Sequence, residues 1–243
     1  MAEQEIVKHT KKVYKIWNSK EHGFWFKLKE FLIEISIIVF AVSLSIWLHE
    51  RSEHATQQQE VKEFLTGLRQ DLLSDIKEMN DDRKSYQQQA HIFSYISGVK
   101  QKEPINSDSL EKNMKSLLNI TRLQQNDGRF EGFKTSGKIG TIEDKVLQDN
   151  IMDLYQENIP SLLSASDNYI RRKNQFIDFY INNQKRFTDS TSNTPLILKM
   201  DEAQNLAGFL ANPDEIIERY DSCISKMHVI VKEIEAKYMN NKE

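Results

Sequence analysis

Residues 61–93 read VKEFLTGLRQDLLSDIKEMNDDRKSYQQQAHIF, and their apolar side chains recur at helical spacing. Successive positions are separated by 4, 3, 4, 4, 3, 7, 4 and 3 residues, which is close to a heptad repeat. The repeat predicts a long helix whose apolar stripe packs along a seam. The seam positions are Val61, Leu65, Leu68, Leu72, Ile76, Met79, Tyr86, Ala90 and Phe93.

A second heptad repeat lies near the C-terminus, after Asn212-Pro213. Its steps alternate between three and four residues, and the proline suits a first helical turn because its missing N–H is not needed there. The positions are Ile217, Tyr220, Ile224, Met227, Val231, Ile234 and Tyr238. Two such helices predict pairing, either within one bundle or between copies of the chain. Val61, Leu65, Leu68 and Leu72 are therefore candidates for an oligomer seam or a bundle seam.

The region between the repeats predicts shorter helices at residues 109–124, 143–158, 160–187 and 201–211. Eight glycines and four prolines among 243 residues make about 5%, against roughly 12% in an average chain, which disfavours sandwiches, barrels and Gly-rich nucleotide-binding folds. The predicted fold class is all-α: an elongated helical bundle with coiled-coil-like seams.

Residues 125–142, QNDGRFEGFKTSGKIGTI, interrupt this pattern with four glycines and predict an irregular loop. The glycine spacing could suggest phosphate binding, but no Gly-Lys-Ser/Thr sequence and no preceding apolar strand accompany it. We expect Phe130, Phe133 and Ile139 to hold this loop against the bundle instead.

On the N-terminal side, residues 31–48 read FLIEISIIVFAVSLSIWL and contain one ionisable side chain, Glu34. Eighteen residues are enough to cross a bilayer when aromatic residues flank them, as Trp25 and Trp47 do here. The alternative is a buried core helix. A mean hydropathy of −0.61 excludes a protein with many spans.

Lysines set the expected orientation. Residues 1–30 hold seven of them, whereas residues 49–68 hold only Arg51 and Lys62 as basic residues. The positive-inside rule then places residues 1–30 in the cytoplasm, residues 31–48 in the membrane and residues 49–243 outside the cytoplasm. An uncleaved anchor is favoured over a cleaved signal peptide because no small-x-small site follows the apolar run.

The N-terminal tail carries lysines at helical spacing, at Lys8, Lys11, Lys12 and Lys15. They predict either a basic helix on anionic lipids or a disordered tail that only sets topology. Glu34, Ala41 and Ser45 share one face of the span, and Ala41-x-x-x-Ser45 would allow close helix approach. This face is either an association surface or part of a polar path; alternatively, Glu34 reaches the headgroups beside Lys27 and Lys29.

Three segments resemble a family of functionally uncharacterised bacterial single-pass membrane proteins, over residues 25–75 and 128–160. The segments are KEFLIE at 29–34, FEGFKTSGKI at 130–139, and Ile142-Glu143-Asp144 through Leu154-Tyr155. Family members commonly carry Leu where this chain has Phe133. The resemblance implies a bacterial inner membrane with a periplasmic helical domain, and it implies no chemistry.

The sequence predicts no enzyme, no cofactor, no metal site and no nucleic-acid partner. The net charge is −3, no His-Glu-x-x-His or Cys-x-x-Cys motif occurs, and the pairs His49–Glu53 and Glu50–His54 lack further ligands. The single cysteine, Cys223, is expected beside the C-terminal seam as a packed residue, with an inter-chain disulfide as the alternative.

These observations lead to two functional hypotheses. The first is a homo-oligomeric membrane protein whose periplasmic bundle acts by binding an unidentified protein, as a scaffold, sensor-like or accessory subunit. The second is a membrane effector, for instance in bacterial defence, whose spans assemble into a pore lined by Glu34, Ser36, Ser43 and Ser45.

Overall fold

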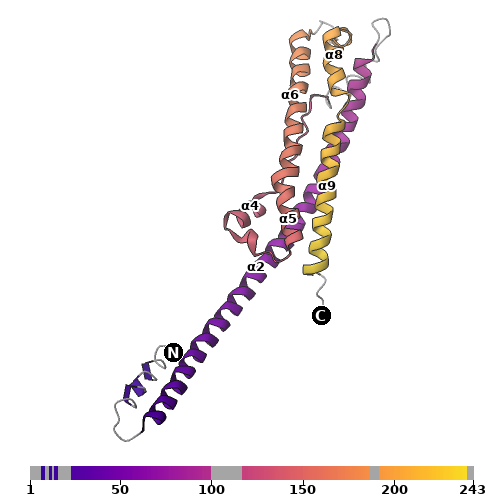
Figure 1. Cartoon of the computed structure of the whole chain (residues 1–243). Helices are drawn as coiled ribbons and strands as arrows, with labels where there is room; N and C mark the ends of the chain where they lie inside the picture. The colour runs from indigo at the N-terminus through magenta and orange to yellow at the C-terminus, as the bar shows by residue number, and fades with distance from the viewer. Residues whose placement is uncertain are drawn as a thin grey trace. The chain divides into compact units, whose positions relative to one another are not determined.

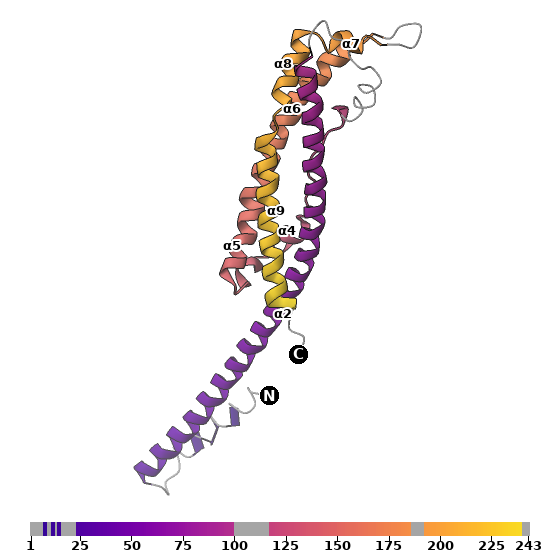
Figure 2. The same cartoon turned by 90° about the vertical axis from the view of Figure 1, so that its right-hand side faces the viewer.

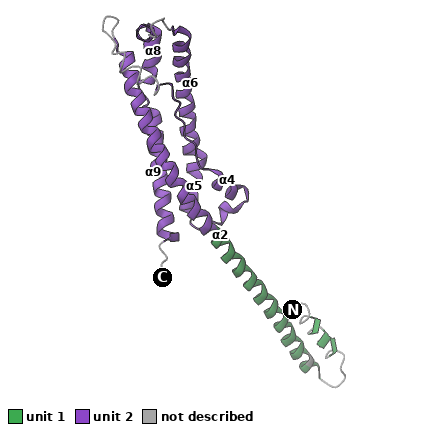
Figure 3. Cartoon of the chain, turned by 180° about the vertical axis from the view of Figure 1, so that it is seen from behind, with its two compact units in different colours: residues 1–60 green, residues 61–243 purple. Residues whose placement is uncertain are grey.

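The computed structural model describes residues 7–8, 11–12, 14–15, 23–99, 117–185 and 192–239. The chain divides into two compact units, residues 1–60 and 61–243 (Figure 3). The fold is all-α, as the sequence predicts: every long element in the described ranges is a helix.

The helix α2 (Phe24–Ser97) has 74 residues and contains the predicted span and the first heptad repeat (Figure 1). It starts directly after Gly23 and ends directly before Gly98, whose N–H bonds the Ser94 and Tyr95 carbonyls. The border between the units falls inside α2, after Glu60.

In the second unit, the part of α2 from Val61 onward lies beside two other long helices, α6 (Ile159–Asn183) and α9 (Asp214–Ile234) (Figures 1 and 2). The shorter helices are α5 (Lys145–Asp153), α7 (Thr194–Ile197) and α8 (Asp201–Leu210), and the π-helical turn η3 (Glu235–Met239) extends α9. Aromatic contacts tie the long helices together, for example Phe93 against Phe176 at 5.2 Å between ring centroids.

The predicted break before Pro160 is wrong. A π-helical turn, η2 (Leu154–Asn158), joins α5 to α6, so that helical structure continues from Lys145 to Asn183. Proline lacks an N–H and its ring crowds the carbonyl four residues earlier. A wider π turn placed just before Pro160 accommodates both effects without ending the helix.

The spacing predicted for the C-terminal helix is correct, but at several positions the buried side chain is the neighbour of the predicted one. Tyr220, Met227 and Ile234 are buried as predicted, yet the core also takes Ile216, Cys223 and Ile230, while Ile217, Ile224 and Tyr238 are half-buried at its edge. Each misplaced position belongs to an adjacent apolar pair or lies at the helix end. Period alone cannot choose between two apolar neighbours on adjoining faces.

The helix predicted at residues 109–124 is confirmed at Leu117 and Leu118 and is wrong from residue 119 onward. Leu110 and Met114 lie outside the described residues, and after a helical Leu117-Leu118 the chain is non-helical from 119 to 127. Side chains of other helices hold this segment: Glu78 accepts from the Gln124 N–H at 2.8 Å, and the Tyr86 hydroxyl donates to the Thr121 carbonyl at 2.7 Å. These polar contacts replace the bonds that an isolated helix would make internally.

The loop predicted at residues 125–142 is also wrong in part, because it contains α4 (Gly128–Thr135) and the 3₁₀ turn η1 (Lys138–Thr141). Between them Gly137 adopts a φ of +74°, which favours glycine. The expected packing is confirmed: Phe130 is buried, and Phe133 and Ile139 pack on the core. Phe133 stacks on Phe64 with 4.0 Å between ring centroids.

Candidate functional site

The candidate membrane segment lies in the first unit, at the start of α2. By length and composition, α2 is the one helix in the described ranges that could cross a membrane, with a mean hydropathy of 2.4 over its best 18-residue window and 6% of that window buried. Its large apolar side chains are exposed, for example Leu32 at 54% and Phe40 at 68%. In water such a continuous apolar surface would need a cover.

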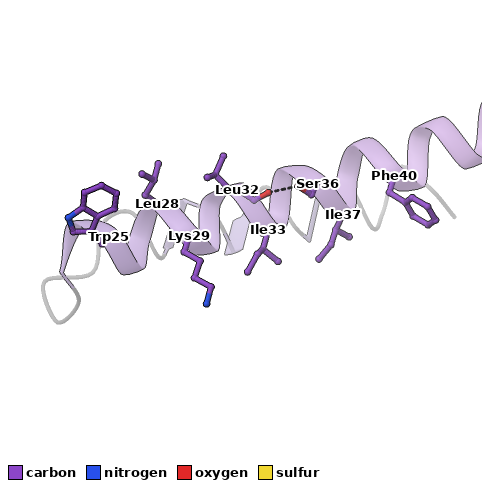
Figure 4. Close-up of a pocket in the computed structure, with 8 residues that line it drawn as sticks. All are labelled: Trp25, Leu28, Lys29, Leu32, Ile33, Ser36, Ile37 and Phe40. Carbon is purple, nitrogen blue, oxygen red and sulfur yellow. Dashed lines mark hydrogen bonds between the residues drawn. The ribbon is translucent and has the colours of Figure 1, made fainter.

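A pocket of about 570 Å³ lies on this segment, and all of its lining comes from α2 (Figure 4). The lining residues are Trp25, Leu28, Lys29, Leu32, Ile33, Ser36, Ile37 and Phe40. At 100° per residue most of them lie on the side of the helix away from Glu34, and Ile33 and Ile37 lie closer to it. The walls are almost entirely apolar, and the Ser36 hydroxyl donates to the Leu32 carbonyl of its own helix at 2.8 Å.

Glu34 is buried, unlike the two residues that share its face. Its side chain is 5% exposed and accepts a hydrogen bond from Lys12 Nζ at 2.6 Å, whereas Ala41 and Ser45 are exposed. The attraction of Glu34 raises the pKa of Lys12, with a smaller contribution from Glu30. The structure thus pairs Glu34 with Lys12 of the N-terminal tail. Lys8, Lys11 and Lys15 are exposed.

The four seam residues of the second unit are buried within one chain. Val61, Leu65, Leu68 and Leu72 are each 0% exposed and belong to the hydrophobic core. The heptad repeat allowed either a seam between copies or a seam inside the bundle, and this placement corresponds to the seam inside the bundle. No side-chain surface of these residues is left for a second copy.

A polar groove of about 450 Å³ lies between η2, the start of α6 and α9. Arg219 crosses it, donating to the Ser161 hydroxyl and to Glu215 Oε1, the latter at 3.3 Å. The Arg219 Nε is buried without a hydrogen-bond partner. Glu157 and Glu218 add two carboxylates, so the groove has a negative balance of charge. No sequence motif marks this groove because its residues come from helices about 60 positions apart.

Cys223 is part of the floor of this groove and belongs to the core at 1% exposure. Burial raises the pKa of its thiol from 9.0 to about 11, and Arg219 opposes this only in part. The thiolate is the reactive form of cysteine. Neither a catalytic thiol nor an easily formed inter-chain disulfide fits this position.

We therefore expect native Cys223 to react with a maleimide at least about 100-fold more slowly than Cys223 of the unfolded chain, since two pKa units lower the thiolate fraction about 100-fold. The measurement is a labelling time course at pH 7.5 with and without denaturant. Equal rates in the two conditions would mean that the thiol is accessible in the folded chain.

Three polar contacts join α2 to other segments of the second unit. Lys173 is 1% exposed and its Nζ donates to Gln89 Oε1 at 2.6 Å and to the Asn119 carbonyl. Nearby, the Tyr220 hydroxyl donates to Asp82 Oδ2 at 2.9 Å, and burial raises the pKa of Asp82. Asp75, at 0% exposure, accepts from the Asn126 N–H and side-chain amide. The contacts of Lys173 and Asp75 hold residues 119–126 against α6 and α2, and the contact between Tyr220 and Asp82 joins α9 to α2.

Among the described residues, no group of three His, Cys, Asp or Glu side chains could hold a metal ion. His49, Glu50, Glu53 and His54 are all exposed on α2. The chain matches no protein-family model, no curated protein and no solved structure. The likeness to a bacterial membrane protein family stays a prediction from residues 25–75 and 128–160.

Proposed function

We propose that this chain is a single-pass membrane protein whose helical domain acts by binding, as a scaffold, sensor-like or accessory subunit. The observation that carries the proposal is the exposure of large apolar side chains over residues 31–48 of α2, combined with a buried, well-packed core over residues 61–234. Lipid is the occupant that suits such a surface, since every backbone group of a helix is already bonded within the helix.

The proposed orientation has the N-terminus in the cytoplasm and residues 49–243 in the periplasm of a bacterium. Its support is the excess of lysines before the span, together with the exposed Lys8, Lys11 and Lys15. Each lysine near an anionic surface contributes about 1 kcal/mol. The bilayer is thus the first partner. A pull-down from native membranes would identify the protein partner of the helical domain and its oligomeric state.

The pore hypothesis has less support from the contacts of the polar residues that it needs. Glu34, the ionisable residue of this set, is buried and paired with Lys12 of the same chain, whereas Ser36, Ser43 and Ser45 are exposed. A carboxylate that lines a pore should instead be available to water. We therefore keep the anchored binding domain as the proposal.

The membrane proposal predicts that charges in the span release the protein from the membrane. Replacing Val39 and Phe40 by Arg adds about 2.5–3.5 kcal/mol for each Arg near the middle of a span. After an alkaline carbonate wash, the wild type should remain in the membrane pellet, and more than half of this double variant should be found in the supernatant.

The matched control replaces Val146 and Leu196 by Arg. These side chains are 62% and 64% exposed on the helical domain, much like Phe40, but they lie outside the span. The control should stay in the pellet. A periplasm-dependent reporter fused after Glu243 should be active, and an active cytoplasmic reporter at that end would overturn the orientation.

A further inference from the structure

We propose that the Lys12–Glu34 ion pair clamps the N-terminal tail to the first turns of α2, so that Glu34 enters the membrane boundary as one half of a neutral pair. This inference rests on the proposed membrane function and adds a role for two of its residues. It also changes the role of Lys12 from a lipid contact to an internal partner.

The geometry supports a clamp between segments distant in sequence. Lys12 and Glu34 are 22 positions apart, and their charged atoms are 2.6 Å apart, which is the length of a charge-assisted hydrogen bond. The described tail residues are helical and lie beside the start of α2 (Figures 1 and 3). Because both residues belong to the same compact unit, the contact is internal to it.

The exposures of the two side chains differ in a way that suits a membrane boundary. The Glu34 side chain is 5% exposed, whereas that of Lys12 is 62% exposed. A buried carboxylate without a partner would be costly next to hydrocarbon, and a hydrogen-bonded cation offsets part of that cost.

The clamp also limits what the Glu34 face can do. Glu34, Ala41 and Ser45 share this face; Lys12 of the tail contacts Glu34, and Ala41 and Ser45 are exposed. A second copy of the chain could reach Ala41 and Ser45 directly, and it could reach Glu34 only after the tail moves away. Association of spans through Glu34 and the closed clamp therefore exclude each other.

The test measures how often the tail opens in the full chain in nanodiscs with anionic lipid. Chymotrypsin cuts after Tyr14, which no variant removes, and nanodiscs expose both membrane faces to the protease. Cleavage that follows local opening reports the population of the open tail. We expect Lys12→Gln and Glu34→Gln each to accelerate cleavage after Tyr14 by roughly tenfold, because either change breaks the pair.

Two further variants separate the pair from other causes. The double variant Lys12→Gln/Glu34→Gln should be cleaved no faster than either single variant, since the second change has no pair left to break. Lys11→Gln, which removes the same charge from the next position, should accelerate cleavage less than twofold. Additive effects of Lys12→Gln and Glu34→Gln, or an equal effect of Lys11→Gln, would overturn the clamp.

Failure of the membrane proposal would look different. In that case the wild-type chain and all variants would fail to incorporate into nanodiscs, and cleavage would be measured on free protein. A chain that incorporates normally but is cleaved at the same rate in every variant would leave the membrane proposal standing and remove the clamp.

Discussion

Leu72→Asp should unfold the helical domain, whereas Leu73→Asp should leave it folded. Leu72 is 0% exposed in the core and Leu73, the next residue of the same helix, is 39% exposed. Losing the buried leucine costs about 1.5–3 kcal/mol. The new carboxylate adds several kcal/mol because nothing in the core pairs with it. The sum is comparable to the about 5–15 kcal/mol that stabilises a whole domain.

The measurement is denaturant unfolding of the full chain in detergent, followed by near-ultraviolet circular dichroism. The tyrosine contribution to this signal reports fixed packing such as that of Tyr86 against Tyr169, at 5.1 Å between ring centroids. The three tryptophans, Trp17, Trp25 and Trp47, lie outside the helical domain. Leu72→Asp should abolish the tyrosine contribution without denaturant. Leu73→Asp should change stability by less than about 1 kcal/mol, as surface substitutions usually do.

The same pair of variants tests the role of the seam between copies of the chain. A folded Leu72→Asp protein that has lost an oligomer would mean that this position faces a second copy and that the buried placement is wrong. Loss of folding in Leu72→Asp alone would assign Val61, Leu65, Leu68 and Leu72 to the bundle of one chain. Association would then have to use the span or another surface.

The heptad repeat of α2 could be predicted well because most of its seam positions, such as Val61 and Ile76, have polar neighbours on both sides. Val61 and Leu65, for example, are buried as the spacing requires. In α9 the apolar pairs Ile216-Ile217 and Ile230-Val231 allow either of two adjoining helix faces to be buried. Which residue of each pair enters the core depends on the helices that pack there. Residues 119–124 were mispredicted as helix because contacts with distant side chains, such as that of Glu78 with the Gln124 N–H, set their conformation.

In the candidate site, too, single residues could be predicted from the sequence, but contacts between distant segments could not. Glu34 could be singled out from sequence, since it is the one charge in an apolar run, but its contact with Lys12 depends on how the tail returns. Lys173 was missed although a signal existed. Tyr169, Lys173, Phe176 and Tyr180 are spaced by 4, 3 and 4 residues, which places this lysine on the buried stripe of α6.

The burial of Lys173 predicts a dependence of stability on pH. Burial lowers the pKa of this lysine to about 8 from 10.5, so between these values the unfolded chain holds the proton more tightly than the folded chain. Raising the pH through this interval therefore favours the folded state. A pKa difference of this size changes the free energy of unfolding by about 3 kcal/mol, and most of this change should appear between pH 7 and pH 10.

The measurement compares the wild type with Lys173→Met by urea unfolding at pH 7, 8.5 and 10. Methionine fills a similar volume but has no charge, so it should lose the gain of about 2–3 kcal/mol on going to pH 10. It also leaves Gln89 Oε1 and the Asn119 carbonyl without their donor, at about 1–3 kcal/mol each. The wild type should therefore be the more stable protein at pH 10, by a margin that shrinks towards pH 7.

The pH range in which stability rises ends where the tyrosines of the core begin to affect stability. Burial raises the pKa of Tyr86 from 10.0 to about 12, so above pH 10 the unfolded chain loses this proton first and the folded state is weakened. That loss occurs in both proteins and cancels in their difference. Lys84→Met is the matched control because its side chain is 64% exposed. A difference between wild type and Lys173→Met that is constant from pH 7 to pH 10, like that of the control, would show that Lys173 keeps an ordinary pKa despite its burial.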